Sequence, residues 1–419
     1  IKKRLMIYIY RIILNIIIIF SPIIILIRLL KKKEHPLRFL EKFTFFSKER
    51  KKGKLIWFHS VSVGELKSII PLLRKLDNDV NISQILITSS TLSSAELFKS
   101  FRFKKAIHQF FPIDNNFLTK RFIKYWSPNL AIFVDSEIWP NMLRNLKQKS
   151  IKRILINARI SKKSYLKWKK LGSFSKNLFQ TFNYCYPQNL ESKKYLKKLG
   201  VQNLKYLGNL KFIQNDLLKK SLDKKFKFFF KSKKIWCAVS THPGEEIICA
   251  KVHQMLCEKY KNLLLIIIPR HTFRTEDLKK ELTDFKMITH VHSQKKKIHK
   301  DTKIYLVDTY GETEKFFEIC KIVFMGKSLI AEGGQNPLEA ARENCHILHG
   351  PKVSNFREIY NYLDKQKISF KITNNNQFLK KILFLLKNKD NTSKVKNKLN
   401  LIGLKILKNN IKEIDSLII

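Results

Sequence analysis

The chain begins with a long apolar stretch. Residues 5–30 read LMIYIYRIILNIIIIFSPIIILIRLL, and the run from Ile12 to Ile27 carries no charge. This uncharged run is slightly shorter than the ~20 residues that cross a bilayer core, but Arg11 could lengthen it by extending its charged end toward the interface. Basic residues flank both sides, and no small-residue cleavage site follows. The pattern predicts an uncleaved membrane anchor over residues 1–33, either one span or a helix held in the interface. A buried core helix is the alternative, which the absence of a polar face disfavours.

From residue 55 onward, short β-branched runs alternate with stretches that have apolar residues at helical spacing. Such alternation predicts parallel sheets with helices on both faces. A basic stretch at 219–234 separates two series of runs, so we expect two doubly wound α/β domains. The predicted strands are 55–61, 85–88, 107–111, 130–134 and 153–157 in the first domain, and 235–239, 263–268, 287–291, 303–307, 322–325 and 346–348 in the second.

Such sheets bind ligands at the carboxyl ends of their strands, and a cleft between the two domains is the default site. The predicted domains cover 34–215 and 216–375. The last segment, 376–419, is predicted to be helical and to pack back on the first domain.

Composition narrows the class of protein. With 44% hydrophobic residues among 419, the chain has enough apolar mass to fold, which excludes disorder. The net charge of +50 favours an anionic partner: nucleic acid, an anionic membrane or a phosphorylated substrate. The six cysteines form no Cys-x-x-Cys pair, so we expect reduced core residues and no metal site.

Polar motifs follow several strands of the first domain. HSVSVGE ends in Glu65, which could act as a general base or simply cap the next helix. DSEIWPN places the carboxylates Asp135 and Glu137 before a helix with a proline in its first turn. NARIS and GNLKF supply Arg159 and Lys211, either as phosphate ligands or as ordinary surface charges.

The second domain has a similar arrangement of strand-end motifs. They are STHPGEE (240–246), PRH (269–271), DTYGE (308–312) and GGQNPLE (333–339). Hydroxyls, a guanidinium and glycine turns before helices suit a nucleotide phosphate. Neither GxxxxGK[ST] nor GxGxxG occurs, so the P-loop and dinucleotide interpretations lack support.

These motifs, with the later GPKVSNFREI, occur in the order seen in 3-deoxy-D-manno-octulosonic acid (Kdo) transferases, and the chain resembles that family from the anchor to about residue 360. The resemblance implies an α/β GT-B fold, with two Rossmann-like domains, an interdomain cleft and an N-terminal membrane anchor helix. It implies inverting transfer of Kdo from CMP-Kdo to the lipid A precursor (lipid IVA) in lipopolysaccharide biosynthesis. The first domain would then bind the acceptor and the second the CMP-sugar. The expected location is the cytoplasmic side of the bacterial inner membrane, in contact with anionic lipids.

Carried over residue by residue, the resemblance makes Glu65 the general base, and Asp135 and Lys211 the groups that stabilise the transition state. It implies no cofactor and no metal, since CMP-Kdo is the donor substrate. The family's usual Glu-Thr-Glu is Asp135-Ser136-Glu137 here, which shortens the first carboxylate. The positions that match the CMP-binding segments are Pro269, Arg270, Tyr310, Gly311, Glu312, Asn336, Pro337, Leu338 and Glu339.

Two other classes of function remain open. A related GT-B transferase could use another nucleotide sugar and another acceptor. A membrane-tethered nucleic-acid binder would use the positive charge without catalysis, but no recognised binding motif with interleaved aromatic and basic residues occurs. We therefore expect no nucleic-acid partner.

Overall fold

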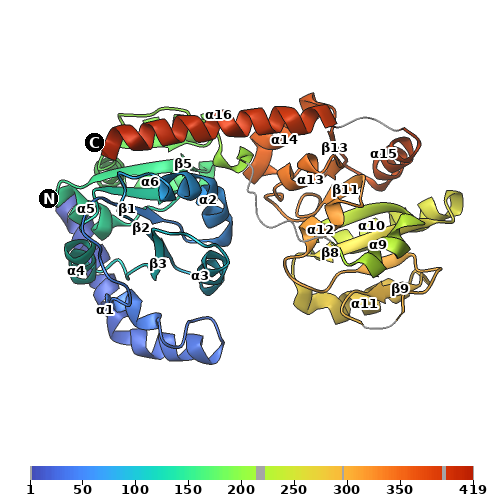
Figure 1. The fold of residues 1–419 in the computed structure, drawn as a ribbon, viewed down its shortest axis with the longest axis horizontal. Coiled ribbons are helices and arrows are strands. Elements are labelled where there is room, and N and C mark those ends of the chain that lie inside the picture. Colours follow the sequence, from blue (N-terminus) through green and yellow to red (C-terminus); the bar gives the residue numbers. More distant parts are fainter. Residues whose placement is uncertain (1, 214–221, 295–296, 389–392, 419) are drawn as a thin grey trace. The chain divides into compact units, whose positions relative to one another are not determined.

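The computed structural model describes residues 2–213, 222–294, 297–388 and 393–418 (Figure 1). The chain divides into two compact units. Unit 1 comprises Ile1–Asn215 and Ile402–Ile419, and unit 2 comprises Asp216–Leu401. The predicted domain boundary between 215 and 216 lies outside the described residues.

Unit 1 is built on a parallel sheet in the order β3-β2-β1-β4-β5-β6. Every residue of β1, β2 and β4 is buried, as expected for strands covered on both faces. The strands are β1 (Leu55–His59), β2 (Gln84–Ser89), β3 (Ala106–Phe110), β4 (Leu130–Val134), β5 (Lys152–Ala158) and β6 (Tyr184–Pro187).

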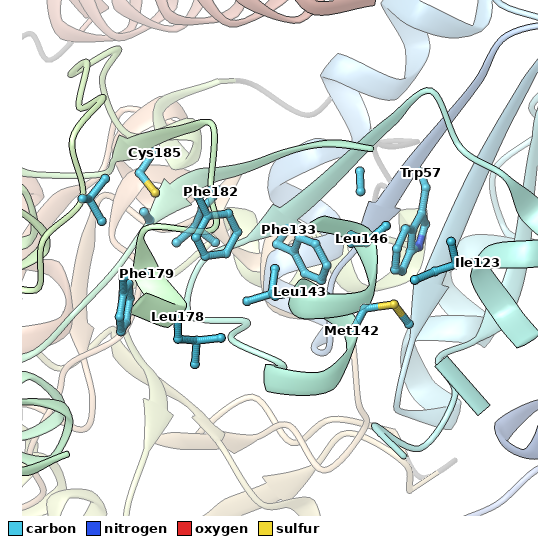
Figure 2. Packing of buried hydrophobic residues seen from close by; sticks show 14 of the residues in the cluster. Trp57, Ile123, Phe133, Met142, Leu143, Leu146, Leu178, Phe179, Phe182 and Cys185 are labelled. Atoms are coloured by element: carbon cyan, nitrogen blue, oxygen red, sulfur yellow. The ribbon is translucent and has the colours of Figure 1, made fainter. Parts of the chain in front are cut away.

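Helices connect these strands and bury their apolar sides against the sheet. Figure 2 shows part of the resulting core, in which Trp57 and Phe133 of the sheet pack near Met142 and Leu143. The helices are α1 (Lys2–Leu30), α2 (Val63–Asp77), α3 (Leu92–Lys99), α4 (Asn116–Trp126), α5 (Pro140–Gln148), α6 (Lys162–Lys170), α7 (Gly172–Phe179) and α8 (Leu190–Lys198), with the 3₁₀ turns η1 (Phe39–Phe43) and η2 (Leu210–Phe212).

Unit 2 has its own parallel sheet, in the order β13-β12-β11-β7-β8-β10-β9. Its strands are β7 (Lys234–Thr241), β8 (Leu263–Pro269), β9 (Thr289–Val291), β10 (Ile304–Leu306), β11 (Ile322–Met325), β12 (His346–His349) and β13 (Ser369–Lys371). Its helices are α9 (Lys224–Lys231), α10 (Glu245–Lys259), α11 (Thr275–Thr283), α12 (Thr313–Phe317), α13 (Leu338–Arg342), α14 (Arg357–Lys365) and α15 (Asn375–Lys387), with η3 (Thr272–Arg274) and η4 (Ser354–Phe356).

The prediction of two parallel, doubly wound sheets is confirmed, but two edge strands were missed. β6 reads YCYP and β13 reads SFK. Both are short and lack the apolar run that identifies a strand covered on two faces. β9 is also shorter than predicted, because residues 287 and 288 lie outside it.

Helix α16 (Ser393–Ile418) starts in unit 2 and ends in unit 1. In unit 1, the Lys152 Nζ donates to the Leu417 carbonyl at 2.9 Å, and the Tyr186 hydroxyl donates to Glu413 Oε2 at 3.0 Å. A Cβ on Gly403 would lie 2.4 Å from the Phe212 carbonyl oxygen, so only glycine allows this close packing.

Candidate active site

Glu65 lies in the first turn of α2, directly after β1. Its Oε2 accepts hydrogen bonds from the amides of Val61 at 2.7 Å and Ser62 at 3.4 Å. The Ser62 hydroxyl in turn accepts from the Glu65 amide, which completes a capping box. The capping role considered from the sequence is therefore present, and it fixes the carboxylate at the carboxyl end of the sheet.

The surroundings of Glu65 favour its protonated form. Burial and the negative charges of Glu137 and Asp135 together raise the pKa of this carboxyl to about 7, against the opposing effect of the two amide hydrogen bonds. A carboxylate with such a pKa is a stronger base than an ordinary glutamate.

Asp135 follows β4 in the left-handed backbone region, with a φ of 64°. Its amide donates to the Ile156 carbonyl at 3.0 Å, and its carbonyl accepts from the Arg159 amide at 2.9 Å. Burial raises the pKa of the Asp135 carboxyl, while the positive charges of Lys211 and Arg159 oppose that rise. The loop thus holds a buried carboxylate beside two cations.

Lys211 lies in η2, which the side chains of Asn157 and Asn209 hold in place. Asn157 Oδ1 accepts from the Leu210 amide at 3.0 Å, and Asn209 Oδ1 accepts from the Lys211 amide at 3.0 Å. Burial lowers the pKa of the Lys211 ammonium, and the charges of Asp135 and Glu65 oppose that lowering. The three predicted catalytic residues therefore gather in one group in unit 1.

Sequence reasoning singled out Glu137 but gave it no role, and it missed His59. The Trp139 Nε1 donates to Glu137 Oε2 at 2.9 Å, and the Nε2 of the fully buried His59 lies 3.5 Å from the same oxygen. His59 Nδ1 lies 3.0 Å from the Thr88 Oγ1, which accepts from Trp57 Nε1 at 2.9 Å.

The Thr88 hydroxyl also donates to the Phe58 carbonyl at 3.4 Å, so it links the His59 and Trp57 rings to the backbone of β1. Burial lowers the pKa of the His59 imidazole, which keeps the ring neutral. Glu137 is therefore held beside Glu65 by the Trp139 ring N–H, with the His59 ring 3.5 Å away.

The effect of Glu137 on Glu65 is open to a direct test. Replacing Glu137 with glutamine removes a negative charge that raises the pKa of Glu65. Glu65 must be deprotonated to act as a base, so kcat/KM rises as the pH passes through its pKa. A lower pKa of Glu65 therefore moves this acidic limb of the pH–rate profile to lower pH. We expect a shift to lower pH in the pH–rate profile of E137Q; an unmoved limb would contradict this electrostatic coupling.

In unit 2, the predicted donor-binding residues lie at the end of β8, after β10 and at the start of α13. Pro269 is buried at the end of β8, and the amide of the exposed Arg270 donates to the Thr241 carbonyl at 3.0 Å. Tyr310 is 74% exposed, and Gly311 has a φ of 82°. The Arg270 and Tyr310 side chains are therefore accessible to a ligand.

Glu312 already has protein partners. Its carboxylate accepts from the Thr309 hydroxyl at 2.6 Å, lies 2.8 Å from His292 Nε2 and pairs with Lys315. Burial would raise the pKa of Glu312, but the hydrogen bonds from Lys315 and Thr309 outweigh it and lower the pKa. A ligand that binds Glu312 would therefore have to share its carboxylate with Thr309, His292 and Lys315.

The glycine-rich loop before α13 is tied to the segment that follows β12. The Gly333 amide donates to the Lys352 carbonyl at 3.0 Å. A Cβ on Gly334, whose φ is 71°, would lie 3.0 Å from the Val353 Cα. The predicted residues at the start of α13 differ in exposure: Asn336 and Glu339 are half-buried, Pro337 is buried and Leu338 is fully buried.

Glu245 joins two strand ends of unit 2. This fully buried carboxylate accepts from the amides of His242 at 3.0 Å, Lys327 at 2.7 Å, Ser328 at 2.9 Å and Leu329 at 3.0 Å. The turn STHPGEE had suggested an external anion at the start of α10. Here the protein's own carboxylate takes the His242 amide and fixes the loop after β11.

Across the described ranges, no group of three or more His, Cys, Asp and Glu side chains is arranged to hold a metal ion. The absence of a cofactor remains a prediction. All six cysteines are free, and burial raises the pKa of thiols such as Cys249 and Cys345.

Comparisons with known proteins show which family the chain is similar to. The family model described as 3-deoxy-D-manno-octulosonic-acid transferase (kdotransferase) matches residues 37–214. The chain is 32% identical to a 3-deoxy-D-manno-octulosonic acid transferase of Rickettsia felis, over 86% of this chain and 77% of that protein. It is 33% identical to the enzyme of the same name from Haemophilus influenzae, over 74% of this chain and 73% of that protein.

Among solved structures, a glycosyltransferase from Rickettsia africae matches 88% of this chain and 99% of its own, with a TM-score of 0.60 at 12% identity, which shows a shared fold. The two doubly wound units thus form a GT-B fold. The chain belongs to the Kdo transferase family.

Proposed function

We propose that this enzyme transfers Kdo from CMP-Kdo to a lipid A precursor, lipid IVA, with inversion at the anomeric carbon. Membership of the Kdo transferase family supports the sugar transferred. The grouping of Glu65, Asp135 and Lys211 at the carboxyl end of one sheet is the observation that carries the proposed chemistry.

In the proposed reaction, Glu65 takes the proton of an acceptor hydroxyl as its oxygen attacks the anomeric carbon of Kdo. The bond from that carbon to the phosphate oxygen breaks, and CMP leaves as a phosphate monoester. A positioned base of this kind contributes about 10²–10⁴-fold to the rate. Lys211 and Asp135 would stabilise the charge that develops during transfer.

Unit 2 would bind the donor. Arg270 offers exposed N–H groups that suit the phosphate, and Tyr310 offers an exposed ring beside the Gly311 turn. The segment from Asn336 to Glu339 would complete the CMP site. These cationic and backbone donors would serve without a metal ion.

The enzyme would act at the cytoplasmic side of the inner membrane. Along α1, the stretch Leu5–Leu30 is long and apolar enough to cross a membrane by length and composition, and 11% of its most apolar window is buried. The charge of +50 would favour contact with anionic lipids and with an acceptor that is itself an anionic lipid.

The direct test is to incubate the purified enzyme with CMP-Kdo and a tetraacyl lipid A precursor and to measure the product by mass spectrometry. We expect a mass increase of one or more Kdo units and release of CMP. Competition by UDP-sugars but not by CMP-Kdo would instead support a GT-B transferase with another donor. Salt-dependent DNA binding without transfer would support the nucleic-acid alternative.

A further inference from the structure

One stripe along α1 is less exposed than the rest of the helix. The less exposed positions recur every three or four residues, which is the spacing of one helix face. Ile7, Ser21 and Ile25 are buried, with 3%, 5% and 8% of their surface exposed. Arg11, Leu14, Ile18 and Arg28 are the half-buried members of the same stripe.

The first half of α1 is tied to the amino-terminal turns of α4 and α5. The Tyr10 hydroxyl donates to Asp114 Oδ2 at 2.8 Å, and Asp114 also accepts from the amides that begin α5. Arg11 donates to Asn141 Oδ1 at 2.9 Å and to Asn116 Oδ1 at 2.8 Å. Asn115 Nδ2 donates to Asn15 Oδ1 at 2.7 Å.

The other end of α1 is tied to the same unit by a second polar network. Arg28 Nε lies 2.6 Å from Glu34 Oε1, and the same carboxylate accepts from Lys42 Nζ at 2.7 Å. Lys42 belongs to η1, and its carbonyl accepts from the Ile113 amide at 3.0 Å. The adjacent Glu41 accepts from the Phe110 amide of β3 at 2.7 Å.

These two attachments conflict with a bilayer-spanning helix. From residue 10 to residue 28 an α-helix rises about 27 Å, which is close to the ~30 Å of a bilayer hydrocarbon core. If α1 crossed the membrane with both attachments intact, unit 1 would have to lie within the bilayer. The solvent-exposed charged side chains and loop backbone of unit 1 would then meet lipid at a high energetic cost.

The remaining surface of α1 is apolar and continues onto unit 1. Fourteen large apolar side chains between Leu5 and Leu30 are exposed. Phe117, next to the Asn116 that binds Arg11, is 67% exposed, and Leu37 and Phe45 at the other attachment are 81% and 54% exposed. The exposed lysines 31–33 and Arg121 lie in or beside the same segments and suit anionic headgroups.

We propose that α1 lies in the plane of the membrane interface, with both of its ends on the same side of the bilayer as unit 1. The lipid surface contacts the apolar sides of α1 together with Leu37, Phe45 and Phe117. This inference rests on the membrane attachment in the proposed function and specifies its topology. The acceptor-binding unit would thereby be held against the surface in which its lipid substrate resides.

The topology can be tested with single cysteines in the full chain. Cys257 is the half-buried native cysteine, so it is replaced by serine. A single cysteine then replaces Lys3 in the first turn of α1 or Lys33 just after its last turn. A third variant has its cysteine at the exposed Lys149, at the end of α5, and reports the position of unit 1. A membrane-impermeant maleimide is added to spheroplasts and to lysed membranes, and labelling is normalised to denatured protein. We expect both α1 ends to react on the same side as K149C; reaction of the two ends from opposite sides would overturn the proposal.

A second measurement reports depth. Single cysteines carry a nitroxide spin label at one of five exposed positions of α1: Ile12, Ile16, Ile19, Ile23 or Ile27. In vesicles of anionic phospholipid, the depth of each label is measured from its collision rates with oxygen and with a water-soluble nickel complex. An in-plane helix gives a similar shallow depth of about 5–10 Å along its length. A depth that peaks near mid-helix at ~15 Å and falls toward both ends would mean that α1 spans.

Failure of this inference differs from failure of the proposed function. A chain that spans the membrane and still transfers Kdo leaves the proposed function intact. A chain that stays in the soluble fraction would reject the membrane attachment on which both statements depend.

Discussion

Replacing Glu65 with glutamine is expected to reduce Kdo transfer by about 10²–10⁴-fold, the usual contribution of a general base. Glutamine keeps an amide oxygen that can accept from the Val61 amide, so the start of α2 should remain folded. It cannot take the acceptor's proton. The measurement is single-turnover transfer with CMP-Kdo and lipid A precursor, together with binding of CMP-Kdo.

The matched control for E65Q is E96Q on α3. Glu96 is exposed in the first turns of the next helix and should tolerate the same chemical change. We expect unchanged transfer in E96Q, and unchanged CMP-Kdo affinity in both variants. Substantial turnover by E65Q would reject Glu65 as the base, and loss of folding would show that its capping role dominates.

Replacing Glu245 with alanine is expected to destabilise unit 2 by about 3–5 kcal/mol, because each buried amide left without a partner costs about 1–3 kcal/mol and water can satisfy only some of them. Four backbone amides from two segments converge on this carboxylate. Without it, the loop after β11 should open. Hydrogen exchange of the amides of residues 327–329 measures this opening directly.

Two variants separate this effect from a general loss of charge. E258Q changes an exposed carboxylate on the same helix and should leave exchange unchanged. E245Q keeps one acceptor oxygen and should lie between alanine and the native residue. Unaltered protection of residues 327–329 in E245A would contradict the role assigned to Glu245.

The sequence predicted the sheets well because their central strands are uninterrupted apolar runs. It could not predict the site to the same depth. The residue types at strand ends singled out Glu65, Asp135 and Lys211 among other polar residues. The resemblance to Kdo transferases gave these three their expected roles, and the structure groups them. The contact of His59 with Glu137 joins residues far apart in the chain, and spacing within a single motif does not reveal it.

The same limit applies to helix α1. Its apolar composition predicted an anchor but left its topology open. Tyr10, Arg11 and Asn15 look like minor interruptions of an apolar segment. Their significance appears only when Asp114, Asn116 and Asn141 are brought opposite them by the fold.

The path of α16 has a practical consequence for dissecting this enzyme. Unit 1 is discontinuous in sequence, since its final helical turns come from residues 402–418. A fragment that stops at residue 215 would leave Tyr186 and Lys152 without their partners Glu413 and Leu417, and would uncover the backbone beside Gly403. Recombinant expression of this half should therefore graft the terminal helix onto it through a short linker, or supply that helix as a separate peptide.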